Sequence, residues 1–245
     1  MYKKPVYVGF VIPTYNEKEN IVRLLDKIHE TMKSIGIEHR IVVVDDNSPD
    51  GTAKLVAEYS RSHNFVKILV RPRKQGLGSA IATGMRDLLS DPRITHIVTM
   101  DADFSHRPED LPVLLRRIDS ADLVQGSRYV DGGKIVGWSF KRRLVSRVAN
   151  TLIRVVHRTN ILDHTSNYRV YSREAAERVV GSVSSSGYEW VIEALLTLLY
   201  SGYTVVEAPI TFIDRTAGKS KLGLRDIAKW FIHILSLKRK LKRTR

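Results

Sequence analysis

Short apolar runs rich in β-branched residues alternate with amphipathic segments along the first half of the chain, and this alternation restricts the fold more than any other feature. The apolar runs predict strands at residues 6–12, 40–45, 66–70, 94–100 and 121–125. The amphipathic segments predict helices at residues 19–32, 51–62, 77–89 and 108–118. Strands and helices in this order indicate an α/β fold with a mainly parallel central sheet and helices on both faces.

The second half of the chain is less regular. Helices are predicted at residues 142–157, 174–180, 189–200 and 224–241, and strands at residues 168–171 and 204–212. No repeat, low-complexity tract or Pro-rich linker divides the two halves. We therefore expect residues 1–245 to form a single domain in which C-terminal helices face the acceptor, and residues 224–245 to form a basic amphipathic helix and tail.

The charge balance indicates a polyanionic partner. The 40 Lys and Arg residues exceed the 26 Asp and Glu residues and give a net charge of +14, and six of the basic residues lie in the last eight positions. Nucleic acid, an acidic membrane surface and phosphorylated substrates all fit such an excess. The chain has no cysteine, which excludes disulfides, Cys-ligated zinc and a thiol nucleophile.

Membrane crossing and secretion are not indicated by the sequence. No apolar run approaches the roughly 18 residues that span a bilayer. The first 13 residues superficially resemble a signal peptide, but they continue into a polar segment without a small-residue cleavage site. We therefore expect a cytoplasmic protein, either dissolved or attached to a membrane surface.

Acidic and polar residues follow three of the predicted strands, at residues 13–17 (Pro-Thr-Tyr-Asn-Glu), 45–51 (Asp-Asp-Asn-Ser-Pro-Asp-Gly) and 101–103 (Asp-Ala-Asp). Each segment alone is compatible with an ordinary turn or helix cap. Parallel sheets, however, bind ligands beyond the carboxyl ends of their strands. Asp101 and Asp103 are two residues apart in extended chain and therefore point the same way. Such paired carboxylates suit Mg²⁺ or Mn²⁺ bridged to substrate phosphates.

These segments resemble the motifs of family 2 glycosyltransferases of the GT-A fold. The resemblance also includes residues 76–78 (Gly-Leu-Gly), 126–129 (Gly-Ser-Arg-Tyr), 214–215 (Asp-Arg) and 218–221 (Gly-Lys-Ser-Lys), and so covers nearly the whole chain. Within the family, the chain most resembles the dolichyl-phosphate mannosyltransferases that lack transmembrane helices. The motif combination is highly specific for a nucleotide-sugar transferase and less specific for the sugar and the acceptor.

The resemblance implies roles for individual residues. It places the nucleotide base and ribose beside Pro13, Tyr15, Glu17, Val44 and Asp46. It assigns contacts with the ribose, the metal and the pyrophosphate to Asp101, Ala102 and Asp103. Ser105 matches an auxiliary position of the metal site, at which relatives can carry Gln. Arg128, Arg215 and Lys221 match positions near the transferred sugar and the phosphates, and residues 218–221 are expected to close over the diphosphate or to form a helix-preceding turn.

The acceptor phosphate is expected at the start of the helix predicted from residue 142. Arg142 and Ser146 are four residues apart and share one helix face, and in the resembling enzymes an Arg and a Ser at this spacing bind the lipid phosphate. Arg143 is an alternative in a shifted register, and a solvated basic face is an equal alternative for Lys141, Arg143 and Arg147. Catalytic contacts are thus expected from Asp103, Arg128, Arg142, Ser146, Arg215 and Lys221. Asp163, Asn167 and Arg169 match polar positions of the family, with a structural role equally expected.

The resulting hypothesis is an inverting, metal-dependent transferase that moves mannose from GDP-mannose to dolichyl or another polyprenyl phosphate at the cytoplasmic face of a membrane. A polyprenyl-phosphate glucosyltransferase that uses UDP-glucose is the first alternative, and a basic nucleic-acid-binding protein is a distant one. No nucleic-acid motif is present, so no nucleic-acid partner is expected. Residues 224–241 either lie on an anionic membrane or pack against the core, and a small membrane-anchoring subunit is an additional candidate partner.

Overall fold

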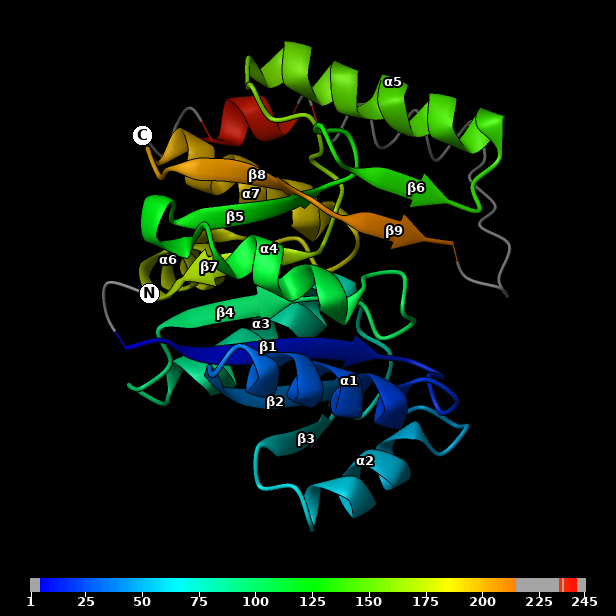
Figure 1. Ribbon diagram of the computed structural model, residues 1–245. Helices are drawn as coiled ribbons and strands as arrows, with labels where there is room; N and C mark the ends of the chain where they lie inside the picture. Colours follow the sequence, from blue (N-terminus) through cyan, green and yellow to red (C-terminus); the bar gives the residue numbers. More distant parts are fainter. Residues whose placement is uncertain (1–4, 215–233, 235, 242–245) are drawn as a thin grey trace.

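The computed structural model describes residues 5–214, 234 and 236–241. Within these residues a seven-stranded sheet has the order β3-β2-β1-β4-β7-β5-β8 (Figure 1). Its strands are β1 (Tyr7–Thr14), β2 (Glu38–Asp45), β3 (Val66–Val70), β4 (His96–Thr99), β5 (Leu123–Ser127), β7 (Arg169–Ser172) and β8 (Val205–Pro209). Only β7 among them is antiparallel to its neighbours. The mainly parallel sheet predicted from the sequence is confirmed.

Helices cover both faces of this sheet. They are α1 (Ile21–Ser34), α2 (Thr52–Ser60), α3 (Leu77–Leu89), α4 (Leu111–Leu115), α6 (Arg173–Ser182) and α7 (Glu189–Tyr200), with 3₁₀ turns η1 (Pro108–Asp110) and η2 (Ile118–Ser120). A further helix, α5 (Phe140–His157), packs against α7 and the C-terminal segment. Successive residues of β1 point to opposite faces, as a pleated strand requires: Phe10 packs in the cluster that includes α1, α2 and α4, and Val11 packs against α3, α6 and α7.

The segment predicted as one strand at residues 204–212 forms two strands instead. After β8 the chain leaves the main sheet, and β9 (Thr211–Ile213) pairs in parallel with β6 (Lys134–Val136). At the switch Ile210 donates its amide to the Ser127 carbonyl, and the chain then continues along β6. The sequence analysis did not predict β6, whose three residues are too few to show a periodic pattern.

The described residues of the C-terminal segment, 234 and 236–241, pack against the rest of the protein. Residues 236–241 are helical, and Ile234, Leu237 and Leu241 are buried in a cluster with α5 and α7. His157 of α5 makes a 3.1 Å hydrogen bond with the Ile234 carbonyl. No helix in the described part of the chain is both long enough and apolar enough to cross a lipid bilayer.

Gly78 in the first turn of α3 sets how closely this helix approaches α7. A Cβ at Gly78 would lie 2.2 Å from the Cβ of Trp190, and Trp190 is itself buried. The preceding Gly76 has φ +98°, a conformation that side chains disfavour. The Gly-Leu-Gly segment therefore permits the tight turn from β3 into α3, as its glycines predict.

We expect Gly78→Ala to lower the free energy of unfolding by about 1–3 kcal/mol, because α3 and α7 must move apart. Thermal unfolding followed by circular dichroism measures this loss. Gly181→Ala is the matched control: nothing lies within 4 Å of a Cβ at Gly181 in α6, so the melting temperature should stay the same or rise. If Gly78→Ala had the same melting temperature as the wild type, this would contradict the close packing of α3 against α7.

Candidate active site

The segments that follow β1 and β2 are joined side by side at the carboxyl edge of the sheet. Three backbone amides of the first segment donate to side chains of the second: Asn16 to Ser48, Glu17 to Thr52 and Lys18 to Asp50, at 2.9–3.0 Å. The ring of Tyr15 is partly exposed and lies 3.9 Å from the Lys74 ammonium group. The structure thus brings the predicted nucleotide-pocket residues Pro13, Tyr15, Glu17, Val44 and Asp46 onto neighbouring strand ends.

The two aspartates that end β2 are both engaged inside the protein. Asp45 is fully buried and accepts hydrogen bonds from the hydroxyls of Thr14 and Ser48 at 2.7 and 2.6 Å. Asp46 forms a buried ion pair with Arg71 and also accepts from the Gln75 amide at 3.1 Å. No local pattern marks Arg71 as its partner, because the two residues are 25 positions apart. A nucleotide contact for Asp46 stays a prediction.

Asp101 is held from two sides just beyond β4. The Asn167 side-chain amide donates to one carboxylate oxygen at 3.0 Å, and the Asp101 backbone amide donates to Nδ1 of His106 at 3.0 Å. Burial lowers the pKa of His106, against the opposing influence of Asp101 and Asp103. His106 is therefore a neutral acceptor at Nδ1, and the side chain of Asp101 beside it is 31% exposed.

Asp103 lies in a tight turn after Asp101. Its carboxylate accepts the Ser105 amide at 3.0 Å, and Phe104 between them has φ +59°. Ala102 is buried. The hydroxyl of Ser105 and the amide oxygen of Asn167 are both buried without a hydrogen-bond partner among the described residues. Residues 101–105 thus carry two carboxylates and one buried hydroxyl without a partner, and the unpaired Asn167 oxygen belongs to the amide that donates to Asp101.

These oxygen atoms are suitable ligands for a hard divalent cation. Within the described residues, no three His, Asp or Glu side chains converge as a complete metal cage. Mg²⁺ and Mn²⁺ do not need one, because Mg²⁺ in particular is usually bound by one or two carboxylates, waters and substrate phosphates. Asp101 and Asp103 supply the carboxylates, and the unpaired Ser105 hydroxyl is a compatible auxiliary oxygen.

Arg128 follows β5 and forms a buried, two-pronged ion pair with Asp163. The Nε and Nη2 atoms each lie 2.7 Å from a carboxylate oxygen, and Nη2 also donates to Thr165 at 2.6 Å. Burial alone would raise the pKa of Asp163, but the Arg128 guanidinium outweighs it and lowers that pKa. The guanidinium also lies within 5.5 Å of three aromatic ring centres, so it is rigidly placed.

Arg142 and Ser146 occupy the protein-facing part of α5. Nη1 of Arg142 donates to both carboxylate oxygens of Asp214 at 2.7 and 2.8 Å, and its guanidinium lies 4.2 Å from the Trp138 ring centre. Ser146 accepts a 2.7 Å hydrogen bond from the Tyr129 hydroxyl. The predicted pair thus lies on one side of the helix, and Arg142 is paired with a carboxylate that the sequence analysis did not connect with it.

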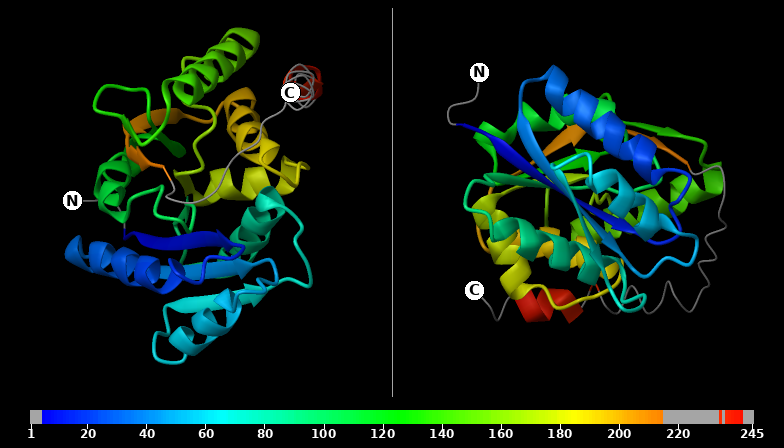
Figure 2. Two further views of the ribbon diagram at one scale, coloured as in Figure 1. Left: turned by 90° about the vertical axis from the view of Figure 1, so that its right-hand side faces the viewer. Right: turned by 90° about the horizontal axis from the view of Figure 1, so that it is seen from below.

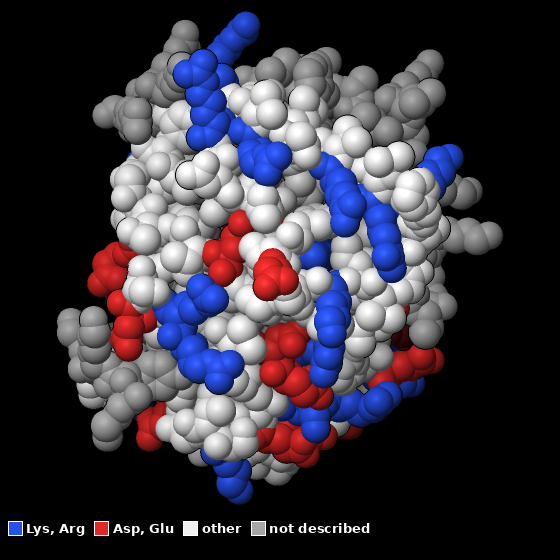
Figure 3. All heavy atoms as spheres, turned by 45° about the horizontal axis from the view of Figure 1, so that its top comes forward, with Lys and Arg blue, Asp and Glu red and all other residues white. Residues whose placement is uncertain are grey.

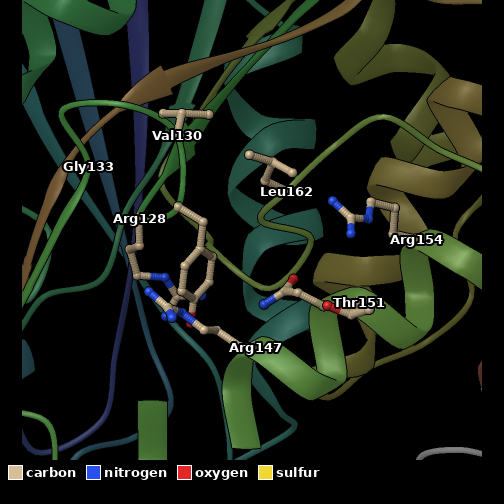
Figure 4. Close-up of a pocket in the computed structure, with 9 residues that line it drawn as sticks. Arg128, Val130, Gly133, Arg147, Thr151, Arg154 and Leu162 are labelled. Atoms are coloured by element: carbon tan, nitrogen blue, oxygen red, sulfur yellow. The ribbon is translucent and has the colours of Figure 1, made fainter. Parts of the chain in front are cut away.

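A cavity of about 330 Å³ opens between α5 and the segment after β5 (Figure 4). Arg147 and Arg154 line it from α5, and Arg128 lines it from the segment after β5 (Figure 4). Neither Arg147 nor Arg154 has a carboxylate partner within the part of the chain that is described. The remaining lining residues are Tyr129, Val130, Gly133, Asn150, Thr151 and Leu162. The cavity is therefore suited to an anion.

The sequence left a phosphate contact and a solvated basic face as equal alternatives for Arg147, and it did not single out Arg154. Their spacing of seven residues places both on one helix face, and this was the available sign. Arg169 is buried, and it donates to the carbonyls of Ser166 and His164, so its role here is structural. Arg215 and Lys221 lie outside the described residues.

Comparison with known proteins identifies related sequences. The family description "Glycosyl transferase family 2" matches residues 10–180. The chain is 40% identical to the polyprenol monophosphomannose synthase of Mycolicibacterium smegmatis over 87% of this chain and 80% of that protein. It is 37% identical to the undecaprenyl-phosphate mannosyltransferase of Micrococcus luteus, over 87% of this chain and 86% of that protein.

Solved structures with low sequence identity share the fold. Glucosyl-3-phosphoglycerate synthase from Mycobacterium tuberculosis, in complex with Mn²⁺, UDP and glucosyl-3-phosphoglycerate, matches with a TM-score of 0.66 and 18% identity, covering 96% of this chain and 80% of that one. Mannosyl-3-phosphoglycerate synthase from Rubrobacter xylanophilus matches with a TM-score of 0.67 and 19% identity, covering 98% and 75%.

Proposed function

Because the chain belongs to glycosyl transferase family 2, we propose that it transfers mannose from GDP-mannose to a polyprenyl phosphate, such as dolichyl phosphate, with inversion at the anomeric carbon. One observation carries this proposal. The strand-end carboxylates Asp101 and Asp103 and an arginine-lined cavity beside α5 provide separate places for a metal-bound diphosphate and for a second phosphate. The two relatives named as mannosyltransferases to polyprenyl or undecaprenyl carriers support the sugar and the class of acceptor.

In this proposal the joined segments after β1 and β2 bind the nucleoside, with Tyr15 and Glu17 beside the base and ribose. The hydrogen bonds between these segments hold the pocket in shape before the donor arrives, so little ordering is required on binding. Val44 and Asp46 support the same wall. Arg215 and Lys221 retain their expected roles at the diphosphate as predictions outside the described residues.

A divalent cation, Mg²⁺ or Mn²⁺, would be held by Asp101 and Asp103 with Ser105 as an auxiliary oxygen. When bound, such an ion offsets the charge of the donor pyrophosphate and of the leaving nucleoside diphosphate. Asn167 holds the Asp101 carboxylate, and His106 accepts a hydrogen bond from the Asp101 backbone amide. The neutral state of His106 adds no positive charge that would compete with the cation for Asp101.

The acceptor in this proposal needs no general base. A phosphate monoester has its second pKa near 6, so at neutral pH it arrives largely as a dianion able to attack the sugar. A hydroxyl acceptor would instead have to lose a proton to a side chain. The protein must therefore hold and desolvate the phosphate, and Arg128, Arg147 and Arg154 around the cavity can do so.

Arg142 and Ser146 complete the acceptor site that we propose. Arg142 is already held by Asp214, so an incoming phosphate must share or replace this carboxylate. Ser146 is fixed by the Tyr129 hydroxyl, and Tyr129 also lines the cavity. An acceptor carried by a lipid places the enzyme at a membrane surface, and we propose a peripheral location on the cytoplasmic face.

The direct test incubates the purified full-length protein with each donor and each acceptor in the presence of Mg²⁺ or Mn²⁺. GDP-mannose should label dolichyl phosphate, and UDP-glucose should not. Labelling from UDP-glucose alone would change the sugar while leaving the acceptor class intact. If neither donor labels the lipid, the proposed transfer is wrong. A gel shift with oligonucleotides at physiological salt tests the nucleic-acid alternative, and we expect no stable complex.

A further inference from the structure

A second cavity, of about 290 Å³, lies between α6, α7 and the C-terminal segment (the α6 cavity). α7 ends at Tyr200, and the carbonyl of Thr204 soon after it accepts the backbone amide of Leu123 at the start of β5. This end of α7 therefore lies at the amino edge of the sheet, opposite the strand-end carboxylates. In Figure 1, α6 and the described C-terminal helix lie to the left, whereas β1 and β5 point to the right. The α6 cavity is thus separate from the candidate active site.

Three segments of the chain meet at the α6 cavity. Both views of Figure 2 show the described C-terminal helix, drawn red, beside the yellow to gold helices α6 and α7. The cavity is lined by Arg178, Gly181 and Ser182 of α6, by Thr197, Tyr200 and Ser201 at the end of α7, and by Lys240 and Leu241. A ligand in this cavity would therefore contact all three segments at once.

Arg178 brings a positive charge to the cavity wall that no carboxylate of the described residues pairs with. Its Nε donates to the Ser201 hydroxyl at 3.1 Å. The nearby acidic side chains are engaged elsewhere, because Glu177 forms an ion pair within α6 and the buried Glu193 forms one with Lys240. A guanidinium in this position favours an anion with several oxygens, such as a phosphate group.

Hydroxyl groups form much of the remaining wall of the α6 cavity. Ser182, Tyr200 and Ser201 line it together with Thr197. Thr197 is 3% exposed, and its hydroxyl is buried without a hydrogen-bond partner among the described residues. A buried hydroxyl of this kind costs stability unless another polar atom satisfies it. Hydroxyls around a guanidinium fit a ligand that carries a phosphate and also hydroxyl groups of its own.

We propose that the α6 cavity is a binding site for a small phosphorylated sugar, with the phosphate at Arg178 and the sugar hydroxyls at Ser182, Thr197 and Ser201. Its volume of about 290 Å³ is at the lower limit of ordinary ligand pockets, which measure about 300–1,000 Å³. A compact ligand therefore fits better than a nucleotide sugar or a lipid. The site does not depend on the proposed transfer reaction, and it is tested without donor or acceptor.

Occupation of the site has a consequence for the C-terminal segment. Lys240 already attaches this segment to α7 through Glu193, and it donates to Ser184 at 2.8 Å. A ligand that contacts both Arg178 and Lys240 would add a second attachment between α6 and the C-terminal segment. Because such a ligand binds only when the segment is docked, it stabilises the docked form in proportion to its own concentration and affinity.

A phosphate compound has another place to bind, which the test must distinguish from the α6 cavity. Arginines line the cavity beside α5. Figure 3 shows that Lys and Arg prevail among the described charged side chains on the upper part of the surface, where α5 lies. Gly133 lines the cavity beside α5, and Gly181 lines the α6 cavity. The chain has 15 glycines, so the amide signals of protein labelled with ¹⁵N-glycine report on the two cavities separately.

The test titrates the full-length labelled protein with glucose 6-phosphate and follows the assigned glycine signals by NMR. The Gly181 signal should shift to saturation, and Arg178→Gln should raise the dissociation constant read from it by about tenfold or more. Thr197→Val should also weaken binding without lowering the melting temperature, because it removes a hydroxyl that has no partner in the free protein.

Arg116→Gln is the matched control for the arginine substitution. Arg116 is exposed and directly follows α4, which packs on the other face of the sheet from α6 and α7. The same loss of charge there should leave the dissociation constant read from Gly181 unchanged. Glucose and inorganic phosphate, titrated in the same way, should each bind more weakly at Gly181 than glucose 6-phosphate does.

Three results would overturn the proposal. The first is a Gly181 signal that glucose 6-phosphate does not shift, including the case in which only Gly133 responds. The second is wild-type affinity in both Arg178→Gln and Thr197→Val. The third is inorganic phosphate that binds at Gly181 as tightly as glucose 6-phosphate, which would make the cavity a general anion site and not a site for a phosphorylated sugar.

Discussion

Replacing Asp163 by Asn is expected to lower the free energy of unfolding by about 3–5 kcal/mol, because the Arg128 guanidinium would remain buried without its counter-charge. The side chains of the pair are only 6% and 0% exposed, so water cannot take the place of the carboxylate. Denaturant unfolding measures the loss directly. In a chain of this length each 1 kcal/mol corresponds to about 2–4 °C in melting temperature, so a large decrease is expected.

A double variant separates stability from function. Arg128→Met with Asp163→Leu removes both charges together, and a buried pair replaced in this way often costs little stability. We expect the double variant to recover much of the stability that Asp163→Asn loses, which a double-mutant cycle quantifies. Transfer to the polyprenyl phosphate should stay impaired, because Arg128 lines the anion cavity. Strictly additive losses in the cycle would show that the pair does not act as a unit.

The pKa of Asp163 determines how the stability contributed by the Arg128–Asp163 pair depends on pH. The Asp163 pKa is lowered from 3.8 in the folded state, so the pairing contributes its full stability above that value. The contribution is lost as the pH falls through the lowered pKa of the folded protein. The pair therefore remains intact across the neutral range in which transfer would be measured.

Asp103→Asn is expected to reduce the rate of sugar transfer by about 100- to 1,000-fold while leaving the fold intact. The substitution removes a negative oxygen that the divalent cation would need, and such an ion supplies several kcal/mol of stabilisation to the departing diphosphate, at about 1.36 kcal/mol per factor of ten. Steady-state transfer measures the rate, and titration with Mn²⁺ in the presence of GDP measures the loss of metal affinity independently of turnover.

The matched control for this substitution is Asp119→Asn. Asp119 is an exposed aspartate in η2, away from the strand-end carboxylates, so the same chemical change should leave the rate and the metal affinity unaltered. Unchanged transfer in Asp103→Asn would remove this residue from the metal site. An equal loss in both variants would indicate a general effect of the lost charge.

The regular part of the fold could be predicted from the sequence because its signals are local. The bounds of β3, α3 and α7 agree with the prediction, since each is a periodic or β-branched run ended by a turn. The expected GT-A architecture is confirmed by the sheet and by the solved structures that share it. The prediction of a single strand at residues 204–212 was wrong, because β9 pairs with the three-residue strand β6 and nothing local marks that change of sheet.

The site was predictable in its residue types and less so in its contacts. Asp101 and Asp103 stood out because strand ends meet at one edge of a parallel sheet. The partners of Asp46 and Arg142 could not be predicted, because Arg71 and Asp214 reach them through tertiary packing. A sequence shows that a charge is present, but whether another side chain already neutralises it depends on the fold.

The position of β7 in the sheet determines when the sheet can be completed during synthesis. This strand lies between β4 and β5, pairing Thr99 with Arg169 and Gln125 with Arg169, although both neighbours leave the ribosome earlier. At about 5–20 residues per second, β4 waits several seconds with an unpaired edge. Asn167, which holds Asp101, arrives with the same segment. A nascent chain therefore cannot form the Asn167–Asp101 hydrogen bond before the segment that completes the sheet has been made.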